Sequence, residues 1–362
     1  MKLADWSLHF YRLPYARTIV WSNAVESSGS FALLKLTADN GAAGVAEGTI
    51  KSTWSGVSPR SLAAALEEVV LPQLKDADLA DEAALASALA RIPENRLAKG
   101  MVASACWTLR AAAAGQPLWK LWGGEPGVEL SWTVTRQKPA AMAGEAAEYC
   151  ARHGFRTLKV KGGQGLDTDL RALAEIRAAV GAGVELTVDA NGAYGRAEAP
   201  EYVRRIAQAG VALAEDPSPL APDAQFEALQ QGSAIPILVD SSCSTARDAE
   251  LYLARGARAI SLKPGRVGLS ETHAVQALAA KQGARLAVGI YAESALGTLI
   301  SLQQAAAVPR ARSLAAEQSF FLEMTAQVSR LVPEIRQGRV ELPAAADMAS
   351  LVDWDAVKRF AL

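Results

Sequence analysis

The sequence predicts an α/β protein whose larger part is a modified (β/α)₈ barrel of the TIM type, with an α+β capping domain before it. The first observation is a repeat. Five charged residues close short apolar runs at successive gaps of 28, 26, 25 and 23 residues, namely Lys161, Asp189, Glu215, Asp240 and Lys263. Such an interval holds one strand, one helix and two short loops. The second observation is that the runs are rich in Val, Ile and Leu, which suits a parallel sheet buried on both faces.

Residues 1–125 lie outside this repeat and predict the α+β capping domain. Alternating apolar and polar residues indicate three strands, at residues 3–10, 30–38 and 42–50. We expect an irregular stretch over residues 11–29, between the first two strands. Helical periodicity indicates three helices, at residues 61–74, 81–92 and 99–115. Gly115, with Pro117 just beyond it, is a typical helix stop.

From residue 126 the alternation of strand and helix patterns is regular, and we assign residues 126–322 to the barrel. Eight strands are expected, near residues 129–135, 157–161, 185–189, 211–215, 235–240, 258–263, 286–291 and 313–317. Eight parallel strands are enough to close a barrel without free edges. The last segment, residues 323–362, is expected to return to the capping domain and complete it.

The composition narrows the range of partners. The chain has 362 residues, half of them hydrophobic, which is enough for a large core. A formal net charge of −1 favours neither nucleic acid nor an anionic membrane as a partner, and no long apolar run predicts a membrane span. Three widely spaced cysteines, Cys106, Cys150 and Cys243, indicate a reducing compartment rather than a disulfide framework. We therefore expect a soluble, cytoplasmic protein.

Three lysines at the ends of predicted strands are candidates for acid/base chemistry. Lys159 and Lys161 are two residues apart on one strand, so their side chains point the same way. Two neighbouring ammonium groups disfavour each other's charge, which predicts a lowered pKa for at least one of them and allows that lysine to act as a general base near pH 7. Lys263 closes the sixth predicted strand and faces the pair across the barrel mouth. The alternatives are solvated lysines at a strand end and a buried structural lysine.

Three carboxylates come from consecutive strand ends, namely Asp189, Glu215 and Asp240. Bunched anions repel one another unless a cation lies between them, and oxygen ligands select Mg²⁺ or Mn²⁺ over zinc. Each one alone would be read as a helix cap or a surface carboxylate, but the regular spacing favours a common site. Asn191 is expected to face the same way and to orient a ligand or substrate; a plain turn residue is the alternative.

Six segments of the barrel resemble the motifs of one enzyme family: KVK, DAN, AEDP, VDSSCST, SLKPGRVG and YAESALGT. Their sequence is similar to the enolase superfamily, in particular to its muconate-lactonizing-enzyme subgroup. The resemblance implies that Asp189, Glu215 and Asp240 bind Mg²⁺. It also implies that Lys161 and Lys263 form the acid/base pair, with Lys159 beside them. Enolase-superfamily sites abstract a proton α to a carboxylate and stabilise the enediolate with metal. A small-molecule carboxylate substrate and a homo-oligomer are implied in the same way.

The chain also departs from the family pattern. Family members usually carry Glu directly after the third metal ligand, where this chain has Ser241. Glu293 and Glu317 occupy positions that resemble those of site-lining carboxylates, and either is a candidate to bond a metal-site lysine or to donate to a leaving group. The eighth strand region lacks the Asp-x-Asp that binds a substrate ammonium in dipeptide epimerases, which argues against a dipeptide with a free amino terminus.

Substrate choice is expected to lie in two capping loops, because loops carry specificity on a fixed scaffold. The first contains Tyr15, Arg17 and Trp21, and the second contains Lys51, Thr53 and Trp54. Arg17 or Lys51 is a candidate to pair with a second anionic group of the substrate. Four aromatic residues are candidates to enclose a flat ring or a quaternary ammonium, namely Trp21, Trp54, Tyr291 and Phe320. Ordinary packing is the alternative for each.

Three functions remain open on the sequence. The first is racemisation or epimerisation of a substituted amino or hydroxy acid, with Lys161 and Lys263 both acting as bases. The second is a cycloisomerase or dehydratase, in which Lys161 moves the proton and Lys263 mainly stabilises charge. The third is a metal-binding barrel without catalysis, against which the complete set of lysines and carboxylates argues.

Overall fold

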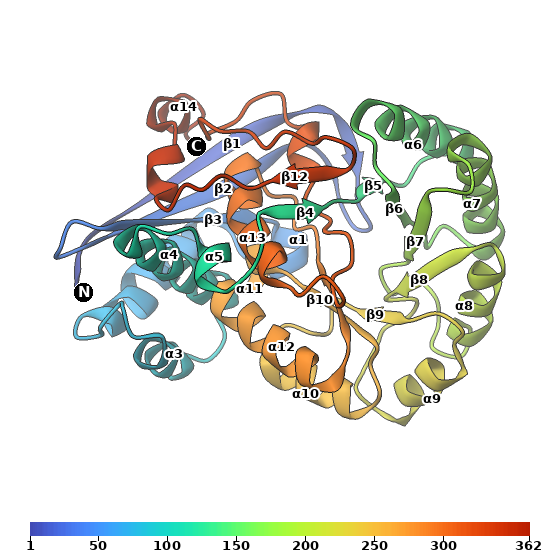
Figure 1. The fold of residues 1–362 in the computed structure, drawn as a ribbon, viewed down its shortest axis with the longest axis horizontal. Coiled ribbons are helices and arrows are strands. Elements are labelled where there is room, and N and C mark those ends of the chain that lie inside the picture. Colours follow the sequence, from blue (N-terminus) through green and yellow to red (C-terminus); the bar gives the residue numbers. More distant parts are fainter.

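The computed structural model describes all 362 residues and contains a curled parallel sheet in the larger part of the chain (Figure 1). Its seven strands run in the order β11-β10-β9-β8-β7-β6-β5, with every pair parallel. They are β5 Trp132–Val134, β6 Thr157–Lys161, β7 Glu185–Asp189, β8 Val211–Glu215, β9 Ile237–Val239, β10 Ala259–Leu262 and β11 Arg285–Val288. The predicted α/β barrel architecture is confirmed.

Helices separate these strands and lie outside the sheet in Figure 1. They are α6 Pro139–His153, α7 Leu166–Val180, α8 Ala199–Gln208, α9 Ala224–Gly232, α10 Ala246–Ala254, α11 Pro264–Val267, α12 Leu269–Gln282 and α13 Ala295–Ala307. Local sequence sets several starts: the Asp223 side chain caps α9, and Thr245 forms a reciprocal capping box with Asp248 at α10. The helices and strands enclose the largest apolar core, which leaves the strand ends free for polar residues.

The eighth predicted strand, at residues 313–317, is not a regular strand. Its backbone instead makes hydrogen bonds first to β11 on one side and then to the chain at Glu129 on the other. Leu314 N donates to Leu286 O and Glu317 N to Val288 O, both at 2.8 Å, on the side of β11. On the other side, Ala316 N donates to Glu129 O at 2.8 Å. The segment therefore makes only isolated bridges to each neighbour, too few hydrogen bonds in a row for regular strand pairing. It still lies between the two edges of the sheet and connects them.

The first predicted barrel strand, 129–135, is divided in two. β5 joins the parallel sheet, whereas β4 Gly127–Glu129 pairs antiparallel with β12 Arg339–Glu341 near the C-terminus. The alternation across both pieces is continuous in the sequence, so the change of pairing partner has no local signal.

The N-terminal part holds an antiparallel sheet of β1 Leu3–Val20, β2 Val25–Ala38 and β3 Ala43–Ile50. The expected irregular stretch over 11–29 is wrong, because both strands continue into it. Within this stretch the pairing breaks between Pro14 and Ile19, and it resumes before the turn that Trp21 N closes onto Ala24 O at 2.9 Å. Proline lacks a backbone donor, and the break in the ladder begins there.

Five helices follow this sheet in the chain: α1 Ser52–Ser55, α2 Pro59–Ala64, α3 Glu82–Ala90, α4 Arg96–Ala114 and α5 Leu118–Leu121. Of these, α2, α3 and α4 share a core with the face of β2 that carries Ala32, Leu34 and Leu36. The single helix expected at 61–74 continues from α2 as a π-helix and ends as a 3₁₀ turn around Pro72, which cannot donate to a helical ladder. α4 ends at Gly115 (φ +64°), as predicted. Gly100 of α4 lies so close to α11 that a Cβ would be 2.6 Å from the Val267 carbonyl carbon. This contact seats α11, the helix after Lys263, on the N-terminal part.

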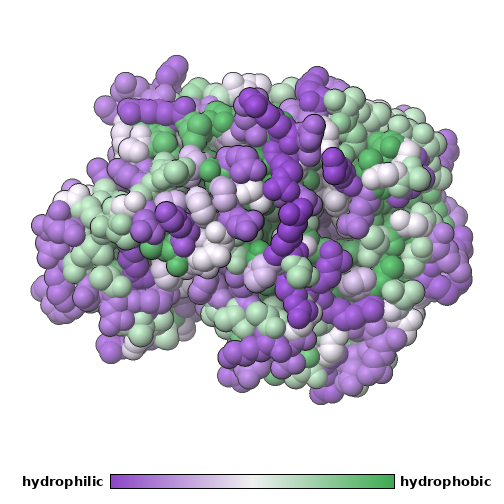
Figure 2. Space-filling view, viewed as in Figure 1, coloured by the Kyte–Doolittle hydropathy of each residue, from purple (hydrophilic) through white to green (hydrophobic).

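The C-terminal segment contains two 3₁₀ turns, η3 Phe320–Glu323 and η4 Met348–Leu351, and the helix α14 Trp354–Arg359. It crosses β1 in Figure 1, and Leu362 N donates to Phe10 O at 3.0 Å. Thr325 N donates to Pro14 O at 3.0 Å. The domain limits at residues 125 and 322 stay a prediction. No helix is both long and apolar enough to cross a membrane, and the surface in Figure 2 is mostly hydrophilic with scattered apolar residues.

Candidate active site

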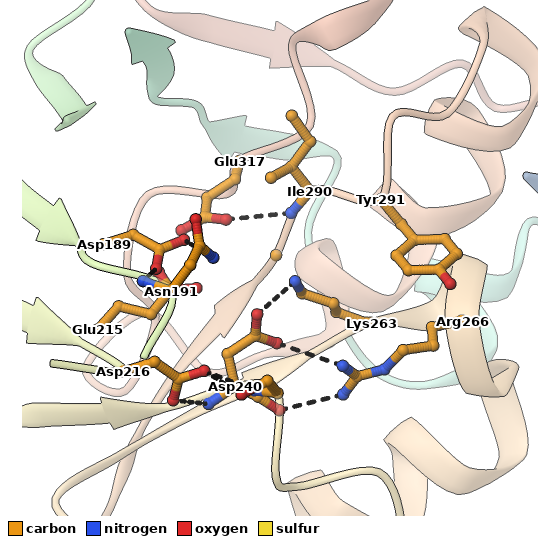
Figure 3. Close-up of polar contacts among 12 residues, drawn as sticks. Asp189, Asn191, Glu215, Asp216, Asp240, Lys263, Arg266, Ile290, Tyr291 and Glu317 are labelled. Carbon is orange, nitrogen blue, oxygen red and sulfur yellow. Dashed lines mark hydrogen bonds and ion pairs between the residues drawn. The ribbon is translucent and has the colours of Figure 1, made fainter. Parts of the chain in front are cut away.

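The charged residues singled out in the sequence meet at the carboxyl ends of the barrel strands. Lys161, Asp189 and Glu215 are the last residues of β6, β7 and β8, and neighbouring strands pair them in register. Asp240 follows β9 directly, and Lys263 follows β10. Figure 3 shows Asp189, Glu215 and Asp240 around one space, with Lys263 entering from the side of β10.

Lys159 lies at the centre of this group and is 1% exposed. Its Nζ is 2.7 Å from Glu215, 2.8 Å from Glu317 and 3.1 Å from Asp189. Burial opposes the charge on this lysine, but the surrounding carboxylates outweigh burial and raise its pKa well above the usual value. Lys159 is therefore not the member of the pair whose pKa is lowered, because carboxylates outnumber ammonium groups around it.

Lys161 and Lys263 approach the carboxylates from opposite sides, since β7, β8 and β9 lie between their strands. The Lys161 Nζ is 2.6 Å from Asp189 Oδ2, and the Lys263 Nζ is 2.5 Å from Asp240 Oδ2. Burial lowers the pKa of Lys263, but Asp240 overrides burial and the net shift is upward. Gly289 leaves room for this side chain, because a Cβ there would be 2.9 Å from the Lys263 Cε.

Asn191 is both a turn residue and a polar partner in the site. Its φ is +50°, in the left-handed region that Asn tolerates. Its backbone N donates to Asp189 Oδ1 at 2.8 Å, and its Oδ1 accepts from Lys161 Nζ at 3.3 Å. Asn191 is therefore a turn residue, as one interpretation of the sequence had it, and it also contacts charged residues of the site.

The donor set fits a divalent cation. Asp189, Glu215 and Asp240 are all buried carboxylates, and Asp240 Oδ1 has no hydrogen-bond partner. Burial and the neighbouring Asp189 and Glu317 raise the pKa of Glu215 well above its usual range, a strain that a cation would relieve. The three carboxylates do not converge on one cation position as they stand, because the Lys159 ammonium lies between Asp189 and Glu215.

Two further residues, Asp216 and Arg266, support Asp240 and were not singled out from the sequence. Asp216 follows Glu215 with φ +37° and accepts from Asp240 N at 3.1 Å. Arg266 Nη2 donates to the Asp240 carbonyl at 3.1 Å, and its Nη1 lies 3.8 Å from Asp240 Oδ1 (Figure 3). The sequence signal for Arg266 is its place three residues after Lys263, one turn into α11.

Glu317 and Glu293 differ in what they contact. Glu317 accepts from Lys159 Nζ at 2.8 Å and from Ile290 N at 3.0 Å, so it bonds a lysine of the site. Glu293 instead accepts from Tyr291 N at 2.8 Å and from Gln318 Nε2 at 3.3 Å, and it bonds none of the three lysines. Burial raises the pKa of Glu293 to about 7.

The cations of the capping loops are already paired. Arg17 Nη2 is 3.0 Å from both Glu145 and Glu323. Lys51 is buried and bonds Glu26. The aromatic candidates do gather in one cluster: Trp21 contacts Trp54 and Phe320, at ring-centre distances of 5.0 and 5.1 Å, and Trp54 contacts Tyr291 at 5.6 Å. The Thr53 carbonyl accepts from Asn23 at 3.0 Å on the exposed side of the loop.

Comparison with known proteins agrees with this geometry. Residues 141–346 match the enolase C-terminal domain-like family, and residues 12–123 match the mandelate racemase / muconate lactonizing enzyme N-terminal domain. The L-Ala-D/L-Glu epimerase of Bacillus subtilis is 32% identical over 272 residues, covering 73% of this chain and 74% of that protein. The N-succinylamino acid racemase of Thermus thermophilus is 29% identical, covering 84% and 83%.

A solved structure shows the same fold. The muconate lactonizing enzyme from Pseudomonas fluorescens, complexed with muconolactone, superposes with a TM-score of 0.91 at 24% identity, covering 100% of this chain and 99% of that one. The family match takes in all but the first strand of the barrel and the greater part of the N-terminal sheet and helices. On these matches and on the barrel that carries its charged strand ends, the chain belongs to the mandelate racemase/muconate lactonizing enzyme family of the enolase superfamily.

Proposed function

We propose that this enzyme removes the proton α to a substrate carboxylate in a Mg²⁺-dependent reaction and delivers a different proton to the opposite face. It would thereby racemise or epimerise a substituted amino or hydroxy acid. The observation that carries the proposal is the placement of Lys161 and Lys263. The two ammonium groups approach one carboxylate cluster from strands on opposite sides of the half-barrel, at 2.6 and 2.5 Å from different carboxylates.

This placement supports proton transfer on two faces. A substrate whose α-carbon lies between β6 and β10 presents one face to Lys161 and the other to Lys263. One lysine takes the proton as a base while the other, still protonated, delivers a proton from the far side. Inversion needs both groups within reach of one carbon, which is what lysines on opposite strands provide.

The residues proposed to hold Mg²⁺ are Asp189, Glu215 and Asp240. The chemistry supplied by the bound ion is stabilisation of the negative charge that develops on the substrate carboxylate. Lys159 contributes to the same end, since its buried ammonium is a fixed positive charge among the carboxylates. Glu317 accepts a hydrogen bond from that ammonium, and the backbone N of Ile290 donates to Glu317 and holds it in place.

The proposal is tested by α-proton exchange in D₂O across a library of carboxylic acids, with the chirality of each product determined. We expect exchange with inversion for at least one substituted amino or hydroxy acid. Exchange that leads to a lactone or an alkene, without inversion, would support a cycloisomerase or dehydratase. A protein that binds metal yet exchanges no member of the library would revive the non-catalytic alternative.

A further inference from the structure

The cation of the first capping loop is held by two carboxylates. Arg17 Nη2 is 3.0 Å from Glu145 and from Glu323, which are 9% and 2% exposed in their side chains. Its Nη1 also donates to Thr135 Oγ1 at 3.3 Å. Burial lowers the pKa of Arg17, but Glu145 and Glu323 outweigh burial and raise it overall. The guanidinium therefore stays charged and is paired with these two carboxylates. This group has one positive and two negative charges, and it offers no unpaired cation to a substrate.

The cation of the second capping loop is enclosed by the protein itself. The Lys51 Nζ lies 5.0, 5.3 and 5.7 Å from the ring centres of Trp21, Trp54 and Tyr15. Its charge is matched by Glu26, which also accepts from Trp21 Nε1 at 2.8 Å. Because Lys51 fills this aromatic cage, the cage is closed to a quaternary ammonium from a substrate.

The rings around Lys51 also pack on aromatic residues that lie toward the catalytic residues. Trp54 contacts Tyr291, which Figure 3 shows beside Lys263 and Arg266. Trp21 contacts Phe320, three residues after Glu317. Tyr291 is 3% exposed, and its hydroxyl has no hydrogen-bond partner. A row of packed aromatic rings therefore leads from the site to the loops, and the ion pair of Lys51 and Glu26 lies beside it.

From this we infer the substrate class, given the proposed function: a monocarboxylate whose distal substituent is uncharged and apolar. Glu26 would act as the residue that sets this preference, because it neutralises Lys51, the cation that the rings of the cluster enclose. A second carboxylate on the substrate would be desolvated against rings and carboxylates without a free partner, which is costly. An aryl or branched acyl group would instead bury apolar area against those rings. Substrates with two carboxylates, such as muconate or N-succinyl amino acids, would therefore be poor.

The first experiment compares three N-acyl derivatives of one amino acid with the wild-type enzyme. N-succinyl and N-succinamoyl groups have nearly the same shape but differ by one charge, and N-benzoyl presents a flat apolar ring. We expect kcat/KM for α-proton exchange to be at least about tenfold higher for the succinamoyl than for the succinyl compound, and highest for benzoyl. Equal values, or a preference for succinyl, would overturn the inference.

The second experiment releases the charge of Lys51. Glu26→Gln should raise the succinyl-to-succinamoyl ratio of kcat/KM by about tenfold, because the ammonium gains an anionic partner only from the succinyl group. The double variant Glu26→Gln/Lys51→Met should return the ratio to the wild-type value. Glu82→Gln, which loses a carboxylate paired with Arg110 in the N-terminal part, is the matched control and should leave the ratio unchanged. A ratio that Glu26→Gln does not move would count against Glu26 as the determinant.

Binding without chemistry separates the two proposals. α-Methyl analogues of the three compounds have no α-proton, and calorimetry with them measures affinity alone. If no compound exchanges but the uncharged analogues bind about tenfold tighter, the proposed reaction fails while the substrate class stands. If the succinyl compound exchanges and binds best, the reaction stands and the substrate class fails. The comparison of the three compounds uses only the wild-type enzyme. It therefore tests the substrate class even if Glu26→Gln does not fold.

Discussion

The carboxylate of Asp216 accepts a hydrogen bond from the hydroxyl of Ser241 at 2.5 Å, and a second from the Ser241 backbone N at 2.8 Å. Asp216 is buried, and burial, with Asp240 and Asp189 nearby, raises its pKa to about 6. The family pattern places a carboxylate directly after the third metal ligand, where this chain has Ser241. Asp216, on the neighbouring strand end, thus bonds both Ser241 and the backbone N of Asp240, and it fixes the position of the chain that carries Asp240.

The first prediction is that Asp216→Asn weakens metal binding by roughly 10–100-fold, the range typical of residues that orient a ligand. Asn tolerates the φ of +37° but accepts fewer hydrogen bonds from residues 240 and 241, so the Asp240 carboxylate is held less firmly. Calorimetric titration with Mg²⁺ measures the change. Asp216→Asn/Ser241→Asp moves the carboxylate across to residue 241 and should restore affinity in part; a purely structural role for Asp216 would show no such recovery.

The second prediction concerns metal dependence. Activity should be lost on exhaustive EDTA treatment and return with Mg²⁺, with Mn²⁺ as a partial replacement, because both favour oxygen ligands. Asp189→Asn should abolish binding, since it removes a buried charge of the proposed set. Exchange rates before and after chelation provide the measurement. Full activity without divalent metal would contradict the assignment of Asp189, Glu215 and Asp240.

The third prediction is a pH dependence of stability from Glu293. Burial raises its pKa from 4.5 to about 7, so the folded state holds a proton that the unfolded state releases at lower pH. Stability contributed by this proton is present below about pH 4.5 and is lost as the pH rises toward 7, by up to roughly 3 kcal/mol. Glu293→Gln should flatten the denaturant-unfolding free energy between pH 5 and 8. Glu47 is a second buried carboxyl nearby, with its own raised pKa, and would retain part of the slope.

The control for this prediction is Glu250→Gln, an exposed position on α10. Its unfolding free energy should follow the wild-type curve across the same pH range. Equal slopes for Glu293→Gln and the wild type would assign the pH dependence to other groups.

The central strands could be predicted from the sequence because each carries its own local signal. A strand buried on both faces appears as an apolar run, and the closing charges placed β6, β7 and β8 at their observed ends. The same register brought Lys161, Asp189 and Glu215 together at one rim. The segment 313–317 was predicted as a strand but does not form one. It divides its hydrogen bonds between two neighbours, and its own residues do not specify that division.

The charge partners of the capping loops could not be predicted either. Arg17 and Lys51 were candidates for a substrate anion, but Glu323 lies 306 residues from Arg17 in the chain. Glu26 lies on a strand that the sequence presented as an irregular stretch. Such ion pairs depend on the tertiary packing of segments that are far apart in the chain, and the pattern of hydrophobic residues does not predict that packing. The substrate preference inferred from them is therefore visible only in the structure.

The last prediction separates the two lysines. If Lys161 and Lys263 serve opposite faces of the α-carbon, Lys161→Ala and Lys263→Ala should each stop racemisation, because one face then lacks a proton donor or acceptor. Each variant should still exchange the α-proton of the one enantiomer that faces its remaining lysine, as measured by NMR in D₂O with each pure enantiomer. Lys281→Ala, an exposed position on α12, is the control and should racemise normally. Loss of exchange in Lys161→Ala for both enantiomers, with exchange retained in Lys263→Ala, would indicate a one-face reaction such as cycloisomerisation. Exchange of the same enantiomer by both variants would refute the two-face assignment, because a single face cannot be served from β6 and β10 at once.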